Sequence, residues 1–386
     1  MADLITTPLT AALLLGALDV EHTEHGLMPY RLPARARAQA DQQLLMAAGQ
    51  PSGVRLAFRT RATVIELDAH RTTMAFRGVP PRPDGRYDLF IDGRATGQAV
   101  STGGTTVIVD SATGEAEIQP GPPATVRFAE LPAGEKDVEI WLPHYERVEL
   151  LSLRTDAGVE PAGAASRPLW LHHGSSISQG SNAASPGTTW AALAAAHGGV
   201  DLINLGFSGS AMLDPFVART MRDLPADLIS VKIGINLVNG DVMRLRAFTP
   251  AVHGFLDTIR DGHPATPLLV VSPILCPIHE DTPGPGALDL TDGTMRFRAT
   301  GDPTDVRAGK LTLQVIRSEL TRIIEQRATY DPNLFLLDGR ELYGEADAAE
   351  LPLPDRLHPD AATHRLIAER FTAAAFGAGG PFARTP

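Results

Sequence analysis

The sequence predicts two domains, an all-β domain over residues 1–156 and an α/β domain with a parallel sheet over residues 168–386. Three observations support this prediction. The chain has 386 residues, which is longer than one ordinary hydrophobic core requires. Short alternating runs punctuated by Pro and Gly fill the first part. After Arg167, apolar runs begin to alternate with helical patterns, and residues 157–167, rich in Ala, Gly and Pro, are expected to be a linker.

The β-domain is expected to be a sandwich or a jelly roll, because it contains many short strand patterns at regular spacing. Asp92-Gly93 follows one of these patterns and is typical of a two-residue hairpin turn. The runs that we expect to be strands are 54–58, 62–67, 87–91, 107–109, 126–128, 138–142 and 148–153.

The second domain is expected to contain parallel strands joined by crossover helices. The expected strands are 168–173, 201–205, 227–233, 267–272 and 333–337, and the expected helices lie near 188–197, 248–260, 306–326 and 359–376. Within the third of these helices, Leu313, Ile316, Leu320 and Ile323 repeat at spacings of three and four and form one apolar face. Residues 277–309 are rich in Pro, Gly, Asp and Thr, which predicts a long surface loop that can act as a lid.

The composition excludes several classes of function. Hydrophobic residues make up 43% of the chain and charged residues 20%, as in globular proteins. The formal net charge is -11 without a basic run, so we expect no binding to nucleic acid or to an anionic membrane. Cys276 is the one cysteine, so the chain forms no internal disulfide and no thiolate zinc site.

The N-terminal region contains an apolar stretch, 9–18, that has the length of a signal-peptide core. Asp3 stands where a signal peptide has basic residues, and no Lys or Arg precedes Tyr30. We therefore expect a structural element there and a cytoplasmic rather than a secreted protein. No apolar run approaches the ~20 residues of a membrane span.

Polar residues follow the ends of the predicted parallel strands. Ligands of such sheets bind beyond the carboxyl ends of the strands. A hydroxyl, a glycine amide, a side-chain amide and an Asp/His pair would meet there, which is the set of groups that acyl transfer requires. The segments are Gly174-Ser175-Ser176-Ile177, Gly206-Phe207-Ser208-Gly209-Ser210, Gly234-Ile235-Asn236 and Asp355-Arg356-Leu357-His358-Pro359.

These segments resemble the sequence blocks of the SGNH (GDSL-like) hydrolase superfamily. The first resembles block one, Gly206 block two, the segment ending in Asn236 block three, and Asp355 with His358 the D-x-x-H of the last block. The resemblance covers roughly residues 168–376. It implies a three-layer α/β/α, flavodoxin-like domain, no metal or other cofactor, and ester or thioester hydrolysis or acyl transfer. A β-domain before such a domain is also similar to certain bacterial carbohydrate esterases.

The first block departs from the family pattern at one position. The family usually has Asp before the nucleophile, whereas this chain has Ser175. Variants with Ser there are common in the family, so the departure does not indicate inactivity. It removes a charge beside the nucleophile and leaves the substrate range open.

Ser176, His358 and Asp355 are the predicted catalytic residues. A serine hydroxyl needs an adjacent base, which His358 can provide. Asp355, three residues earlier, can bind the other ring nitrogen and fix its tautomer. Taken alone, Ser176 could instead cap a helix, and His358 precedes Pro359 as at a helix start. The joint occurrence of the blocks favours the catalytic interpretation.

The predicted oxyanion hole combines the backbone N–H groups of Ser176 and Gly206 with the side-chain amide of Asn236. Taken alone, Gly206 is also typical of an ordinary turn, and Asn236 of a loop residue that bonds its own backbone.

Other polar and aromatic residues carry weaker signals. Adjacent strand residues point to opposite faces, so His172-His173 is expected to pack rather than chelate. His279-Glu280-Asp281 has no second cluster to complete a metal site. Trp141, Trp170 and Trp190 are expected in the core rather than as sugar platforms.

These residues predict a serine esterase acting on a short acyl ester, such as an acetyl ester of a carbohydrate, through an acyl-enzyme. The same residues would also serve an O-acyltransferase that uses an alcohol acceptor. A third alternative is a carbohydrate-binding protein with a silent hydrolase domain, which the intact set of catalytic residues disfavours. The expected partner is a small-molecule or carbohydrate ester.

Overall fold

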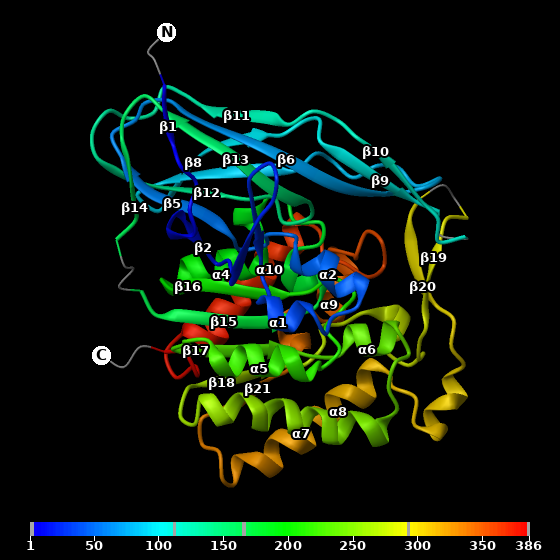
Figure 1. The fold of residues 1–386 in the computed structure, drawn as a ribbon. Coiled ribbons are helices and arrows are strands. Elements are labelled where there is room, and N and C mark those ends of the chain that lie inside the picture. The colour runs from blue at the N-terminus through cyan, green and yellow to red at the C-terminus, as the bar shows by residue number, and fades with distance from the viewer. Residues whose placement is uncertain (1–3, 111–112, 164–166, 292–293, 384–386) are drawn as a thin grey trace. The chain divides into compact units, whose positions relative to one another are not determined.

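The computed structural model describes residues 4–110, 113–163, 167–291 and 294–383. The chain divides into two compact units. The first, here called the β unit, comprises Met1–Arg37, Leu45–Ser166 and Ser185–Gly187, and the second, the α/β unit, comprises Ala38–Leu44, Arg167–Ala184 and Thr188–Pro386. Each unit is drawn in Figure 1. Residues 38–44, which lie inside the predicted β-domain, thus group with the α/β unit, where Arg219 Nη2 donates to Gln39 Oε1 at 2.8 Å.

The β unit contains two sheets, coloured blue to green in Figure 1. The larger runs β10 (Ala116–Gln119), β9 (Thr105–Val109), β6 (Ile65–Phe76), β13 (Arg147–Thr155), β4 (Leu27–Tyr30) and β3 (Asp19–His22), with β1 (Ile5–Thr7) on β13 and β11 (Ala124–Phe128) on β6. The smaller runs β14 (Val159–Pro161), β5 (Arg55–Thr60), β12 (Lys136–Trp141), β7 (Arg86–Ile91) and β8 (Arg94–Val100), with β2 (Leu14–Leu15) on β5. The segment between β4 and β5 contains α1 (Ala34–Arg37) and α2 (Gln42–Ala48).

The core of the β unit forms because apolar side chains, which point inward, alternate with polar side chains along the strands. In β6, Ile65 and Leu67 are fully buried, whereas Glu66 and Asp68, which alternate with them, pair with Arg154. Residues from both sheets form one buried apolar cluster, so the predicted sandwich is confirmed. The predicted hairpin turn is also present, because β7 and β8 pair across Asp92 (φ 49°) and Gly93 (φ 74°).

The α/β unit is built on a five-stranded parallel sheet in the order β16 (Asp201–Gly206), β15 (Leu169–Gly174), β17 (Leu228–Lys232), β18 (Leu268–Val271) and β21 (Leu334–Leu337). In chain order this is 2-1-3-4-5, the flavodoxin-like order, as predicted. One face bears α4 (Trp190–Gly198) and α10 (Ala361–Phe371), the other α5 (Pro215–Asp223), α7 (Leu245–Gly262) and α8 (Leu313–Ala328) (Figure 1). The short helices are α3 (Ser176–Gln179), α6 (Ile235–Asn239) and α9 (Glu345–Glu350).

Trp170 and His173, three positions apart in β15, pack against opposite helix layers. Trp170 stacks on Phe371 of α10, with ring centroids 5.1 Å apart, whereas His173 stacks on Phe255 of α7 at 5.6 Å. The sheet is therefore buried on both faces, which explains its continuous apolar strands.

Two expectations about irregular segments are wrong. Part of the predicted linker is the edge strand β14, because Val159 packs on the core of the β unit and Pro161 is tolerated at a sheet edge. Residues 277–309 are not one continuous loop. They contain the hairpin of β19 (Gly286–Asp289) and β20 (Arg296–Ala299), and a 3₁₀ helix at Pro303–Ala308 in place of the expected start of α8.

Within the described part of the chain, no helix has the length and apolarity that crossing a membrane requires.

Candidate active site

Ser176 is the first residue of α3, directly beyond the carboxyl end of β15. Ser175 caps this helix, since its Oγ accepts a hydrogen bond from the Ile177 N–H at 3.3 Å. The turn between strand and helix requires Gly174, because a Cβ there would lie 2.3 Å from Ser178 Oγ. The Ser175 side chain is therefore a helix cap at the position where the related family usually has Asp.

Ser176, His358 and Asp355 form one hydrogen-bonded chain. Ser176 Oγ lies 2.9 Å from His358 Nε2, and His358 Nδ1 lies 2.7 Å from Asp355 Oδ2. All three residues are buried. The carboxylate accepts at Nδ1, so Nδ1 carries the proton and Nε2 is left to accept from the serine hydroxyl. The structure thus brings together the three predicted catalytic residues.

The backbone holds Asp355 in place. Its Oδ1 accepts hydrogen bonds from the N–H groups of Leu357 at 2.9 Å and His358 at 2.7 Å. Burial alone would raise the pKa of Asp355, but His358 and these two N–H groups outweigh burial and hold the pKa below its usual value. Asp355 is therefore an anion at neutral pH and can stabilise an imidazolium.

Asn236 lies in the first turn of α6, beyond β17. Its Oδ1 accepts from the Ala211 N–H at 3.1 Å, which orients the side-chain amide. Among the described residues, no acceptor binds Asn236 Nδ2. This amide nitrogen can therefore donate to a substrate oxygen, as predicted for an oxyanion hole.

The prediction for Gly206 is wrong, because its N–H is already used. It donates to Asn204 Oδ1 at 2.8 Å. Glycine is needed there for close packing, since a Cβ would lie 2.4 Å from the Gln179 backbone nitrogen in α3.

Gly209, three residues further on, is a candidate donor that the sequence pattern did not single out. It has φ 70°, and its N–H has no acceptor in the part of the chain that the structure describes. The same loop continues to Ala211, which bonds Asn236. The signal that marks Gly209 in the sequence is its place between Ser208 and Ser210 in a strand-end loop.

A buried polar network lies beneath α3. Ser230 Oγ accepts from Trp170 Nε1 at 2.8 Å and lies 2.7 Å from His172 Nδ1, and His172 Nε2 lies 2.8 Å from Ser178 Oγ. Burial lowers the pKa of His172 well below 6.5, so this histidine is neutral. The expectation that His172 packs rather than chelates agrees with these contacts.

Two residues of His279-Glu280-Asp281, the histidine and the glutamate, have structural partners. His279 lies 3.3 Å from Asn239 Oδ1, and Glu280 forms a bidentate pair with Arg317 at 2.7 Å. These contacts use the side chains that a metal would need.

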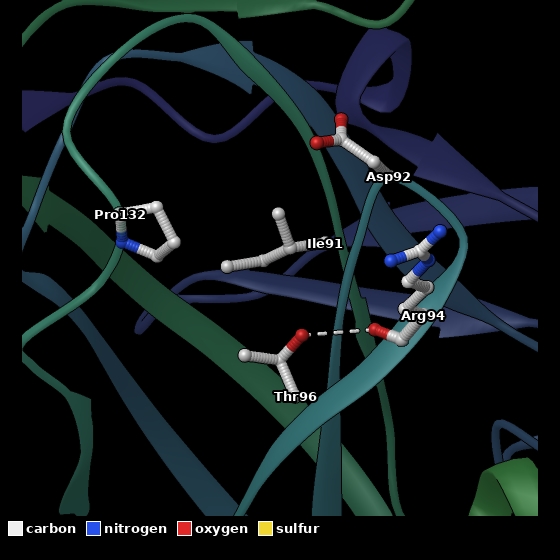
Figure 2. A pocket seen from close by; sticks show the side chains of 5 residues that line it. All are labelled: Ile91, Asp92, Arg94, Thr96 and Pro132. Atoms are coloured by element: carbon white, nitrogen blue, oxygen red, sulfur yellow. Dashed lines mark hydrogen bonds between the residues drawn. The ribbon is translucent and has the colours of Figure 1, made fainter.

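The β unit has a shallow pocket of about 450 Å³, lined by Ile91, Asp92, Arg94, Thr96 and Pro132. Figure 2 shows Thr96 Oγ1 donating to the Arg94 carbonyl oxygen, at 2.9 Å. These lining residues include none of the predicted site residues and no aromatic ring on which a sugar could stack. The pocket therefore adds nothing to the catalytic site.

The fold and the Ser–His–Asp chain define the class of protein, an ester-acting enzyme with a GDSL-like fold. Residues 169–276 match the family model of the GDSL-like lipase/acylhydrolase family, and residues 13–151 match that of the SsfX3 N-terminal domain. The resemblance to the SGNH (GDSL-like) hydrolases is thereby confirmed.

Among solved structures, the chain is similar to the salicylyl-acyltransferase SsfX3 from a tetracycline biosynthetic pathway, at 28% identity over 95% of each chain and a TM-score of 0.76. It shares its fold with a Bacteroides ovatus protein described as a GDSL-like lipase, at 18% identity, 96% of each chain and a TM-score of 0.68. It also shares its fold with a family two carbohydrate esterase from Clostridium thermocellum, at 15% identity, 83% of this chain, 91% of that chain and a TM-score of 0.54. The search of curated proteins found no match.

Proposed function

We propose that this chain is a serine esterase that cleaves a short acyl ester through an acyl-enzyme on Ser176. The observation that carries the proposal is the continuous chain from Ser176 Oγ through His358 to Asp355. This arrangement supplies a nucleophile, a base and a group that orients the base.

The proposed reaction has two halves. His358 Nε2 takes the Ser176 proton as Oγ bonds to the ester carbonyl carbon, and then returns that proton to the alcohol oxygen as the C–O bond breaks. Water then loses a proton to His358 and attacks the acyl-enzyme, and Ser176 recovers its proton as the acid leaves. Asp355 stays ionised throughout and stabilises the imidazolium.

The negative oxygen of each tetrahedral intermediate needs donors. Asn236 Nδ2 and the N–H groups of Ser176 and Gly209 have no acceptor among the described residues, and we propose that they form the oxyanion hole. Gly209 thus replaces Gly206 in this role.

Acyl transfer to an alcohol is the second candidate function. The observation that favours it is the 28% identity, over 95% of both chains, to a salicylyl-acyltransferase. Both functions share the first half-reaction and differ in whether water or an alcohol takes the acyl group. The acetyl-carbohydrate substrate rests on fold likeness alone.

The test is hydrolysis of p-nitrophenyl acetate by the wild type and by Ser176→Ala, both checked by circular dichroism. The wild type is expected to turn over and the folded variant to lose activity. Ser175→Ala is the matched control, because it removes a neighbouring hydroxyl that bonds Ile177, and it should retain turnover. Equal activity of Ser176→Ala and wild type would refute the proposal. Product analysis with added alcohols then separates hydrolysis from transfer.

A further inference from the structure

The hairpin of β19 and β20 presents an apolar face. Its register pairs Leu288 with Phe297, so their side chains lie on the same face, whereas Ala287 and Arg298 form a pair on the other. Leu288 is 37% exposed and Leu290, two residues further on, 42%. Large apolar side chains are thus exposed beside one aromatic ring.

This face adjoins the catalytic histidine. The Phe297 N–H donates to the Asp355 carbonyl oxygen at 2.9 Å, and the Phe297 ring meets the His358 ring edge to face, with centroids 5.5 Å apart and planes at 76°. The backbone bond fixes the strand, and the ring contact places Phe297 next to the base.

The base of the hairpin is held against α6, the helix that contains Asn236. A Cβ at Gly284 would collide with the Val238 carbonyl oxygen, and a Cβ at Gly286 would collide with Asn239 Oδ1. Both glycines therefore allow this segment to approach α6 closely. His279 also lies 3.3 Å from Asn239 Oδ1. The hairpin is therefore fixed to both the catalytic loop and the helix of the oxyanion hole.

Proton transfer determines which part of the substrate lies near His358. This histidine returns its proton to the oxygen of the departing alcohol, and later takes one from the incoming water or alcohol. The alcohol oxygen must therefore come within hydrogen-bond reach of His358 Nε2. The group attached to that oxygen then lies beside Phe297 and Leu288, and the acyl chain lies on the other side of the reacting carbon.

We propose that Phe297 and Leu288 form the alcohol subsite and select alcohols with an aromatic or other apolar group; this inference rests on the proposed function of Ser176. In hydrolysis the subsite binds the leaving alcohol, and in transfer it binds the acceptor. Phe297 and Leu288 are specificity-determining residues, and their side chains take no part in the chemical steps.

The test varies the alcohol and the acyl group separately in the full-length chain. Methyl acetate and benzyl acetate differ in the alcohol, and methyl acetate and methyl butyrate differ in the acyl group. For Phe297→Ala, the ratio of kcat/KM for benzyl over methyl acetate should fall about fivefold or more, because an aromatic contact is lost. The butyrate-to-acetate ratio should stay unchanged. Leu288→Ala, at a half-exposed side chain, should shift the first ratio in the same direction without affecting folding.

Arg298→Ala is the matched control, since it shortens an exposed side chain on the opposite face of the same hairpin. Both ratios should equal those of the wild type. The inference is overturned if Ser176-dependent hydrolysis is present but the benzyl-to-methyl ratio does not move, or if the butyrate-to-acetate ratio moves in its place. Loss of Ser176 dependence is a different outcome, and it refutes the proposed function.

Discussion

Ser176 Oγ and His358 Nε2 lie 2.9 Å apart, although 182 positions separate the two residues in the chain. The contact forms because the turn after β15 and the loop before α10 reach the same edge of the parallel sheet. The proposed catalysis depends on that contact and on the groups that hold it.

Asp355→Asn should lower kcat by about four orders of magnitude with little effect on folding. The amide oxygen can still accept from the Leu357 and His358 N–H groups, but the amide nitrogen then faces His358 Nδ1 and favours the wrong tautomer. Steady-state kinetics with p-nitrophenyl acetate check this. Activity near the wild-type level would show that Asp355 does not orient the base.

Asn236→Ala should lower kcat by about 10²- to 10³-fold and leave KM nearly unchanged, because the donor acts on the transition state. Asn236→Asp is the informative companion. It keeps an acceptor for the Ala211 N–H but replaces the donor with a negative oxygen, so kcat should fall at least as far. A rise in KM at constant kcat would indicate a binding role and exclude the oxyanion role.

Gly206→Ala should destabilise the α/β unit by about 1–3 kcal/mol and lower activity, because the new Cβ collides with backbone atoms of α3. Gly254→Ala is the matched control. Gly254 lies exposed within α7 with nothing within 4 Å of a new Cβ, so the change should raise stability by about 0.5–1 kcal/mol. Thermal unfolding measures both, and equal effects would contradict the packing argument.

The titration of His364 should lower the free energy of unfolding as the pH falls. The Trp190 N–H donates to its Nδ1 at 3.2 Å, and its Nε2 donates to the Ser181 carbonyl oxygen at 2.8 Å. Burial lowers the pKa of His364 from 6.5 to about 4. The unfolded chain therefore binds this proton first as pH falls, and the contribution to the free energy of unfolding drops by about 3 kcal/mol between pH 6.5 and 4.

The variant that tests this is His364→Gln, which can keep both hydrogen bonds but does not titrate. Urea unfolding at pH 7 and pH 4 should show a smaller loss of stability in the variant than in the wild type. The same loss in both proteins would assign the acid sensitivity to other groups.

Much of this fold can be predicted from the sequence because the patterns that mark its strands, turns and helices lie within short segments of the chain. The alternation of apolar and polar residues in 62–67 and the Asp92-Gly93 turn indicate strands. The change in the spacing of apolar residues after Arg167 indicates the parallel sheet and its helices. The catalytic residues can be predicted to form one site because the carboxyl ends of parallel strands lie at the same edge of the sheet. Segments that are far apart in the chain are therefore close together there.

The features that the sequence did not show depend on long-range contacts. The β19–β20 hairpin lacks a strand pattern of its own and is held by the Phe297 N–H bond to Asp355 and by the packing of Gly284 on α6. The choice between Gly206 and Gly209 depends on where the Asn204 side chain points, which no spacing reveals.

The most direct test is to trap the acyl-enzyme. The protein is mixed with p-nitrophenyl acetate, quenched in acid during turnover, digested and examined by mass spectrometry. We expect an acetyl group on Ser176 that is absent from Ser176→Ala. An acetyl group on another residue at equal rate in both proteins, or turnover with no acylated serine, would contradict it.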